Sequence, residues 1–192
     1  MKNVIRALSI ILVAVTFINA QNNIPKGWFP SGNDISEYEI GIDNSVSTNG
    51  NSCAYIKSIS PKENTFGNLM QTISAEKYLN KRLKMTGFLK TENVQGWSGM
   101  WMRIDGNGRE QLGFDNMQNR SIKGTTDWEM YEIVLDVPEN SKSINFGILL
   151  GGNGKVWMDN IKIAEVDKNV PVTNMIKNNE LPNKPMNLDF EE

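Results

Sequence analysis

The feature that most constrains the fold is a succession of short segments in which apolar and polar residues alternate. They lie between residues 28 and 166, and turn-forming residues separate them. They read YEIGID, CAYIKSI, NLMQTIS, RLKMTGFLKT, WSGMWMRID, EQLGFD, MYEIVLDV, INFGILL and KVWMDNIKIAEV. A period of two is typical of β-strands that bury one face. About nine such segments with no helices between them predict an all-β fold, an antiparallel β-sandwich of the jelly-roll type.

Two Asn-Gly turns lie between alternating segments. DGNG spans residues 105–108, and GGNG spans residues 151–154. Asn-Gly favours the backbone conformation of tight β-hairpins, so each turn predicts a hairpin between the segments that flank it. Only SAEKYLNKR, at 74–82, has the composition of a helical turn.

The first 20 residues have the character of a targeting segment. Two basic residues precede an uncharged apolar run over 7–18, and a small residue, Ala20, stands before Gln21. This order predicts a secretory signal peptide, because the apolar run is too short to span a bilayer as a helix. We therefore expect a secreted or periplasmic protein. No later segment predicts a membrane span.

The remaining chain divides into three parts by composition. Residues 21–166 hold the alternating segments and predict the sandwich domain. Residues 167–185 are rich in proline and asparagine and have no period, which is typical of a linker or an extended surface strap. Residues 186–192, MNLDFEE, alternate again, and we expect them to dock as a strand on the same sandwich.

Composition excludes several functions. The chain has no histidine, which excludes Ser-His-Asp and Cys-His catalysis and histidine-ligated zinc. With 20 basic and 22 acidic residues and no basic stripe, the sequence does not predict a nucleic-acid partner. The single cysteine, Cys53, cannot form an internal disulfide and is expected to be a small core residue.

The segment WSGMWMRID places large side chains on both faces of a strand. Met100, Met102 and Ile104 share one face and suit the core. The opposite face carries two aromatic and two charged side chains: Trp97, Trp101, Arg103 and Asp105. Two interpretations remain open, a ligand-binding surface and ordinary packing of one or both tryptophans beneath another segment.

Two regions resemble a known type of domain. Residues 125–166 run from TTDW through YEIVLDVP to FGILLGGNGKVWMDNI, and residues 89–106 read LKTENVQGWSGMWMRIDG. Both resemble galactose-binding-like jelly rolls, which include many bacterial carbohydrate-binding modules. They also resemble accessory domains attached to bacterial transcription regulators and secreted peptidases. The resemblance is specific for the fold, and it does not fix the ligand.

The resemblance implies a candidate site. Tryptophan faces stack on sugar rings in such modules, so Trp97 and Trp101 are expected to form a platform to which Arg103 and Asp105 add hydrogen bonds. Three residues of the following loop are candidates to border the same groove: Asp115, Asn116 and Arg120. The resemblance also implies a structural calcium ion, with Asp159 and Glu191 as candidate oxygen ligands. No other cofactor is expected.

The function predicted from the sequence is that of a secreted, non-catalytic ligand-binding module, with a polysaccharide or other glycan as the leading ligand. The alternative is a structural or protein-interaction accessory domain without affinity for sugar. A glycosidase is the third interpretation, because two carboxylates can perform that chemistry without histidine.

Overall fold

The computed structural model describes residues 24–176, 184 and 187–188. The predicted signal peptide and most of the predicted terminal strand therefore lie outside the described residues. Nine strands occur in the described part: β1 (Phe29–Gly32), β2 (Tyr38–Asp43), β3 (Cys53–Ser58), β4 (Phe66–Ser74), β5 (Lys81–Asp105), β6 (Gln111–Asp115), β7 (Ile122–Val137), β8 (Ser143–Gly151) and β9 (Lys155–Val166).

All strand pairings are antiparallel, which confirms the predicted fold class. Helical structure in the described part is limited to four short 3-10 turns: η1 (Ile35–Glu37), η2 (Glu76–Tyr78), η3 (Asn107–Arg109) and η4 (Gln118–Arg120). The predicted helical turn at 74–82 corresponds to η2. Within the described ranges the structure contains no helix whose length and apolar character would let it span a membrane.

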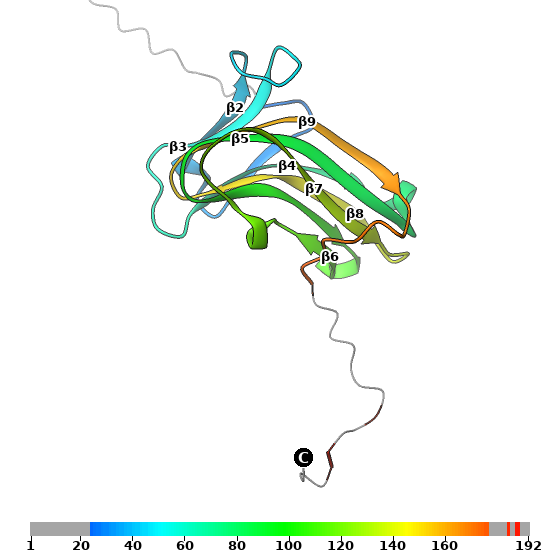
Figure 1. Cartoon of the computed structure of the whole chain (residues 1–192). Coiled ribbons are helices and arrows are strands. Elements are labelled where there is room, and N and C mark those ends of the chain that lie inside the picture. Colours follow the sequence, from blue (N-terminus) through cyan, green and yellow to red (C-terminus); the bar gives the residue numbers. More distant parts are fainter. Residues whose placement is uncertain (1–23, 177–183, 185–186, 189–192) are drawn as a thin grey trace, which may run out of the picture.

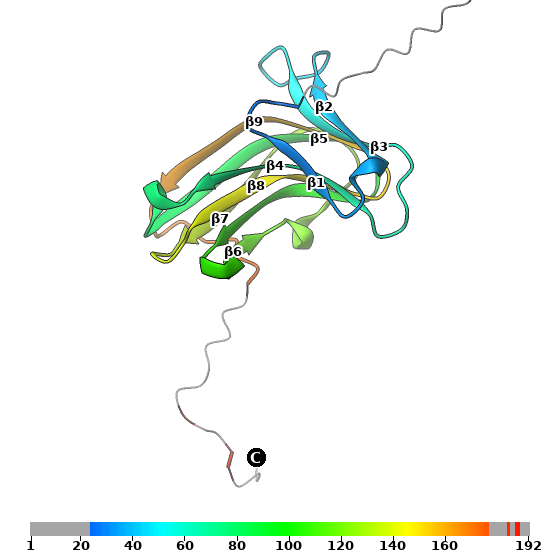
Figure 2. The ribbon, with the colours of Figure 1, turned by 180° about the vertical axis from the view of Figure 1, so that it is seen from behind.

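Strand β5 belongs to both layers of the sandwich. Its first half pairs with β7 and β9, whereas its second half pairs with β8 and β6. One layer, here called the groove sheet, therefore contains β1, β4, β8, the second half of β5 and β6. The other layer, the back sheet, contains β2, β3, β9, the first half of β5 and β7. Figures 1 and 2 show the two layers from opposite sides.

The bend in β5 has a local cause. Asn93 adopts the left-handed conformation, with φ of 52°, and the pairing with β7 shifts register between Thr91 and Val94 and again before Ser98. Asparagine tolerates this conformation better than most residues, and such irregularities bend and twist a strand. The sequence RLKMTGFLKT and the sequence WSGMWMRID therefore form one strand of 25 residues instead of two strands.

One of the two predicted hairpins is wrong. The DGNG turn does join the paired strands β5 and β6. The GGNG turn joins β8 to β9, which do not pair with each other, since β8 pairs with the second half of β5 and β9 with the first half. At residues 151–154 the chain crosses from the groove sheet to the back sheet.

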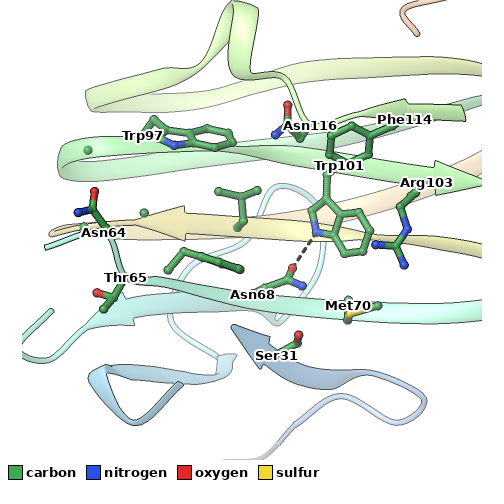
Figure 3. A pocket seen from close by; sticks show the side chains of 15 residues that line it. Ser31, Asn64, Thr65, Asn68, Met70, Trp97, Trp101, Arg103, Phe114 and Asn116 are labelled. Atoms are coloured by element: carbon green, nitrogen blue, oxygen red, sulfur yellow. Dashed lines mark hydrogen bonds between the residues drawn. The ribbon is translucent and has the colours of Figure 1, made fainter. Parts of the chain in front are cut away.

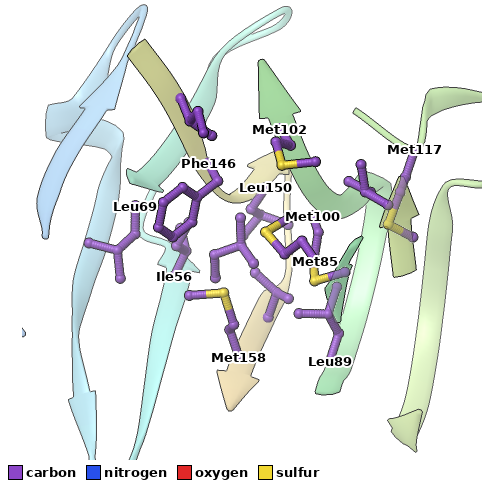
Figure 4. Packing of buried hydrophobic residues seen from close by; sticks show 14 of the residues in the cluster. Ile56, Leu69, Met85, Leu89, Met100, Met102, Met117, Phe146, Leu150 and Met158 are labelled. Atoms are coloured by element: carbon purple, nitrogen blue, oxygen red, sulfur yellow. The ribbon is translucent and has the colours of Figure 1, made fainter. Parts of the chain in front are cut away.

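The core lies between the two sheets and is rich in methionine. Met100, Met102 and Ile104 are fully buried, which confirms the inward face predicted for this part of β5. Figure 4 shows Met100 beside Met85 of the back sheet, and Met102 and Met158 belong to the same core cluster. Burial of each such side chain contributes about 1.5–3 kcal/mol to folding. Cys53 is also buried, as predicted.

Candidate functional site

A groove of about 720 Å³ crosses the outer face of the groove sheet. Its lining comes from all five strands of that sheet and from adjoining loops (Figure 3). The aromatic lining residues are Phe66, Trp97, Trp101 and Phe114. The uncharged polar lining residues are Ser31, Asn64, Thr65, Asn68 and Asn116.

Strand register explains why these side chains meet. Trp97 on β5 lies beside Gly151 on β8, which in turn lies beside Phe66 on β4. Two residues further along β5, Gly99 is paired with Leu149, and Leu149 with Asn68. Neighbouring residues in register project from the same face of a sheet, so residues distant in sequence form one continuous surface.

Trp101 is the floor of the groove. Its indole Nε1 donates a hydrogen bond of 2.7 Å to Asn68 Oδ1 on β4 (Figure 3). To reach Asn68 the indole spans β8, where its own partner in register is Gly147. A Cβ added at Gly147 would lie 2.1 Å from the Leu69 carbonyl oxygen, so no larger residue fits at this position without movement of the strands.

The expectation that Trp101 is an exposed central platform is wrong. The residue is only 7% exposed, because its ring lies flat across the sheet instead of standing out from it. Trp101 nevertheless lies outside the core cluster between the sheets, and it lines the groove. The two interpretations that the sequence left open are therefore both partly right for this residue, since it packs against the outer face of the sheet and also shapes the groove.

Trp97 has a different environment. It is only partly buried, lies four residues before Trp101, and begins the part of β5 that pairs with β8, opposite Gly151. Its ring lines the groove near Asn116, as Figure 3 shows. The face of this indole is the part of the predicted aromatic platform that a ligand can reach.

Arg103 and Asp105 form a fork-shaped ion pair. Arg103 Nε and Nη2 each donate 2.8 Å hydrogen bonds to the two oxygens of Asp105. Asp105 is only 9% exposed and also accepts a bond from Asn145 Nδ2, so its oxygens are occupied within the protein. Arg103 lines the groove and its Asp105 partner does not. Asp105 therefore orients the arginine, and the remaining guanidinium N–H groups are available to a ligand.

The predicted loop residues separate into two roles. Asn116 lines the groove. Asp115 is fully buried and accepts hydrogen bonds from Arg120 Nη1 and Nη2 and from the Met117 N–H, at 3.0, 2.7 and 2.8 Å. Arg120 also donates to the Glu132 carbonyl on β7 at 3.1 Å. Asp115 and Arg120 thus hold the loop that carries Asn116.

The surroundings of Asp159 do not fit the implied calcium site. Asp159 Oδ2 accepts from the Thr48 N–H and hydroxyl at 2.8 and 2.7 Å, and Oδ1 accepts from the Asn160 N–H at 2.7 Å. Hydrogen-bond donors, not further oxygen ligands, surround this carboxylate. Glu191 lies outside the described residues. Across the described part, no group of three or more histidine, cysteine, aspartate or glutamate side chains is placed to hold a metal ion.

A smaller hollow of about 470 Å³ is lined by residues of β2, β3 and β9, among them Asp43, Tyr55 and Lys155. Lys155 Nζ lies 4.2 Å from the ring centroid of Trp157 and 4.6 Å from that of Tyr55, and it pairs with Asp43. Burial alone raises the pKa of Asp43, but hydrogen bonds from Ser45 and Trp157 outweigh it and hold the pKa below its ordinary value. Trp157 is 5% exposed, and its Nε1 donates to Asp43 Oδ2 at 2.8 Å.

Sequence reasoning missed the groove residues that lie on other strands. Asn68 and Met70 of β4, Leu149 of β8 and Phe114 of β6 were not predicted as site residues. A weak signal existed on β4, where Phe66 and Met70 alternate with the buried Leu69 and so place apolar side chains on both faces. Only the register of the strands reveals that these residues share one surface.

The fold and the groove together define a jelly-roll β-sandwich with a groove across the outer face of one sheet. No family model matches the chain. It is 46% identical over 168 residues to the uncharacterized HTH-type transcriptional regulator YbfP of Bacillus subtilis strain 168. This match covers 87% of the chain but only 57% of the relative, so the chain spans a little over half of that protein.

Solved structures with a similar fold include carbohydrate-binding modules. The CBM22-1 xylan-binding domain of Paenibacillus barcinonensis Xyn10C has a TM-score of 0.54 and 10% identity, over 76% of this chain and 89% of that domain. TmCBM61, solved with β-1,4-galactotriose, has a TM-score of 0.50 and 13% identity, over 75% and 92% of the two chains. At such low identity these similarities show the fold alone.

Proposed function

We propose that the chain is a non-catalytic carbohydrate-binding domain that takes a glycan in the groove. The observation that carries the proposal is the groove itself, about 720 Å³ of space lined by aromatic rings and uncharged hydrogen-bonding groups. Sugar rings have apolar C–H faces that pack on aromatic rings, and their hydroxyls require donors and acceptors at defined positions. Sites for such ligands are mostly apolar and contain a few placed polar groups.

The residues that line the groove are expected to have different roles in binding a glycan. Trp101 provides a rigid floor because its hydrogen bond to Asn68 fixes the ring. Trp97 provides the reachable aromatic face. Arg103, oriented by Asp105, supplies charged donors, and Asn116 supplies an amide that can donate and accept. We therefore expect the affinity to depend most on Trp97. The polar groups are expected to determine how the sugar is oriented.

The lining also supports binding rather than catalysis. Among the described residues that line the groove, Arg103 is the only ionisable one. A glycosidase that uses two carboxylates needs both within about 5–9.5 Å across the scissile bond. Of the carboxylates adjacent to lining residues, Asp105 is engaged by Arg103 and Asn145, and Asp115 by Arg120.

The comparisons support the proposal at two levels. The modules of similar fold include one named as xylan-binding and one solved with a galactotriose. The relative named as a transcriptional regulator is longer than the matched region, which favours a domain that serves as part of a larger protein. That relationship also favours the alternative, a protein-interaction or structural accessory domain. Export through the predicted signal peptide is a further proposal.

A comparison of two tryptophan variants tests the proposal. The wild-type protein, Trp97→Ala and Trp128→Ala would be titrated with soluble xylan and β-1,4-galactan by affinity electrophoresis and calorimetry. Trp128 is a matched control because it is also partly buried but lies on β7, away from the groove lining. We expect Trp97→Ala to weaken binding by about tenfold or more, as for a central aromatic contact.

Trp128→Ala is expected to bind like the wild type. Equal loss in both variants would show that the effect comes from stability and not from the groove. If the wild-type protein bound no polysaccharide in a broad panel, the accessory-domain alternative would replace the proposal.

A further inference from the structure

The groove depends on a short strand at the edge of its sheet. β6 has five residues and pairs only with β5 in the described structure. It supplies Phe114 to the groove lining, and Asn116 follows it directly. The outer edge of such a strand has backbone N–H and C=O groups that the sheet leaves without partners.

The chain after β9 covers this edge. Phe114 N–H donates to Asn174 Oδ1 at 3.1 Å, and the Phe114 carbonyl accepts from the Met175 N–H at 2.7 Å. Residues 168–176, here called the strap, thus occupy both backbone groups of a groove residue. In Figure 1 the strap leaves β9 and passes along β6.

The residue before Asn174 binds the other sheet. Thr173 N–H donates to the Val134 carbonyl of β7 at 2.9 Å, and Val134 N–H donates to Thr173 Oγ1 at 3.0 Å. Three consecutive strap residues therefore join the edge of the back sheet to the edge of the groove sheet. β6 is fixed relative to the whole sandwich, not only to β5.

The beginning of the strap has its own anchor. The Arg82 guanidinium donates to the carbonyls of Lys168 and Val170. Arg82 is in turn held by Asp136 through hydrogen bonds of 2.9 and 2.8 Å. Hydrogen bonds therefore hold the strap near both of its ends, and they fix the position of Asn174 relative to the two sheets.

We propose that Asn174 is a positioning residue for the groove, which holds β6 so that Phe114 and Asn116 form one wall of the binding site. The inference rests on the proposed glycan-binding function. It adds that a segment outside the sandwich strands controls the affinity of the groove. Asn174 Oδ1 also accepts from the Ile176 N–H at 3.1 Å, so one oxygen orders both the strand edge and the strap.

The test uses Asn174→Ala, Asn174→Asp and Lys168→Ala in the full chain. The aspartate variant retains an acceptor oxygen at the same place and should rescue the function. Lys168→Ala removes an exposed ion pair with Asp136 at the other end of the strap and is the control. The measurements are the Kd for soluble xylan and β-1,4-galactan, the melting temperature, and hydrogen exchange of the Phe114 amide.

We expect Asn174→Ala to raise the Kd by about two- to tenfold, the range for one lost hydrogen bond, and to speed exchange at Phe114. Asn174→Asp and Lys168→Ala should stay close to the wild type in both measurements. An unchanged Kd in Asn174→Ala would overturn the inference even if the melting temperature fell, since the strap would then be an edge cover only.

A wild-type protein that bound no polysaccharide in the broad panel would contradict the proposed function and not the role of the strap. In that case the role of Asn174 is tested by hydrogen exchange of the Phe114 amide alone. Exchange in Asn174→Ala that matched the wild type would show that Asn174 does not hold β6.

Discussion

Replacement of Trp101 by alanine should destabilise the protein strongly, although the residue lies on the outer face of a sheet. The indole is 7% exposed and a tryptophan buries about 150–250 Å². At about 25 cal/mol per Å² the loss of this area corresponds to at most about 4–6 kcal/mol. Measured losses for buried tryptophan are about 3–5 kcal/mol, and we expect Trp101→Ala to fall in that range.

The hydrogen bond to Asn68 allows the polar part of this loss to be separated. Trp101→Phe keeps most of the apolar contact but leaves the buried Asn68 amide oxygen without its donor, which should cost about 1–3 kcal/mol. In a double-mutant cycle with Asn68→Ala, the two changes should be less than additive by about 0.5–1.5 kcal/mol.

Urea denaturation followed by circular dichroism is the assay, because loss of a tryptophan alters fluorescence directly. Trp101→Ala should also lower the melting temperature by roughly 6–20 °C for a domain of this size. A loss below about 1.5 kcal/mol would refute the reasoning, since it would mean that the ring is exposed in solution. Binding by this variant must be measured well below its melting temperature, where it is folded.

Three further predictions follow from single groups. The Arg82 guanidinium holds the pKa of Asp136 below its ordinary value of 3.8, so this pair stabilises the fold above that pH and loses its contribution as the pH falls. Melting curves of Asp136→Asn between about pH 5 and 2.5 should show a weaker acid dependence than the wild type. Burial raises the pKa of the Cys53 thiol to about 12, so a thiol reagent at neutral pH should label Cys53 only after unfolding, and rapid labelling of the native protein would contradict its burial. Expression in a bacterial host followed by N-terminal sequencing should give a mature chain that starts at or within a few residues of Gln21; intact Met1 in a membrane fraction would rule out cleavage.

The fold class was predictable from the sequence because each strand carries a local signal. The period of two places Met100, Met102 and Ile104 on one face, and no other element is needed to infer that this face is buried. The bounds of β2, β3, β4, β6, β8 and β9 lie within two residues of the predicted segments, whereas β7 begins at Ile122, eight residues before its segment, and β1 was not predicted. Pattern alone determined which face of each strand is inside.

The partners of each strand were not predictable in the same way. The GGNG turn has the composition of a hairpin, yet its flanking strands pair with different halves of β5. A local turn signal reports the conformation of four residues, whereas pairing depends on which distant strands compete for the same edge. Asn93 has a left-handed backbone conformation that lets β5 bend from one sheet into the other. Its role could not be inferred without knowing that β5 pairs in both sheets.

In the candidate site, too, some features follow from the local sequence pattern and others only from strand pairing. The sequence by itself determined that Trp97, Trp101 and Arg103 share the outer face of one strand, because alternation fixes the direction of each side chain. Only the tertiary structure decided that Trp101 is buried, since its indole reaches past Gly147 of β8 to a hydrogen-bond acceptor, Asn68, on β4. Burial of an outward side chain depends on what the neighbouring strands place beneath and beside it, and that information is distributed over residues far apart in the chain.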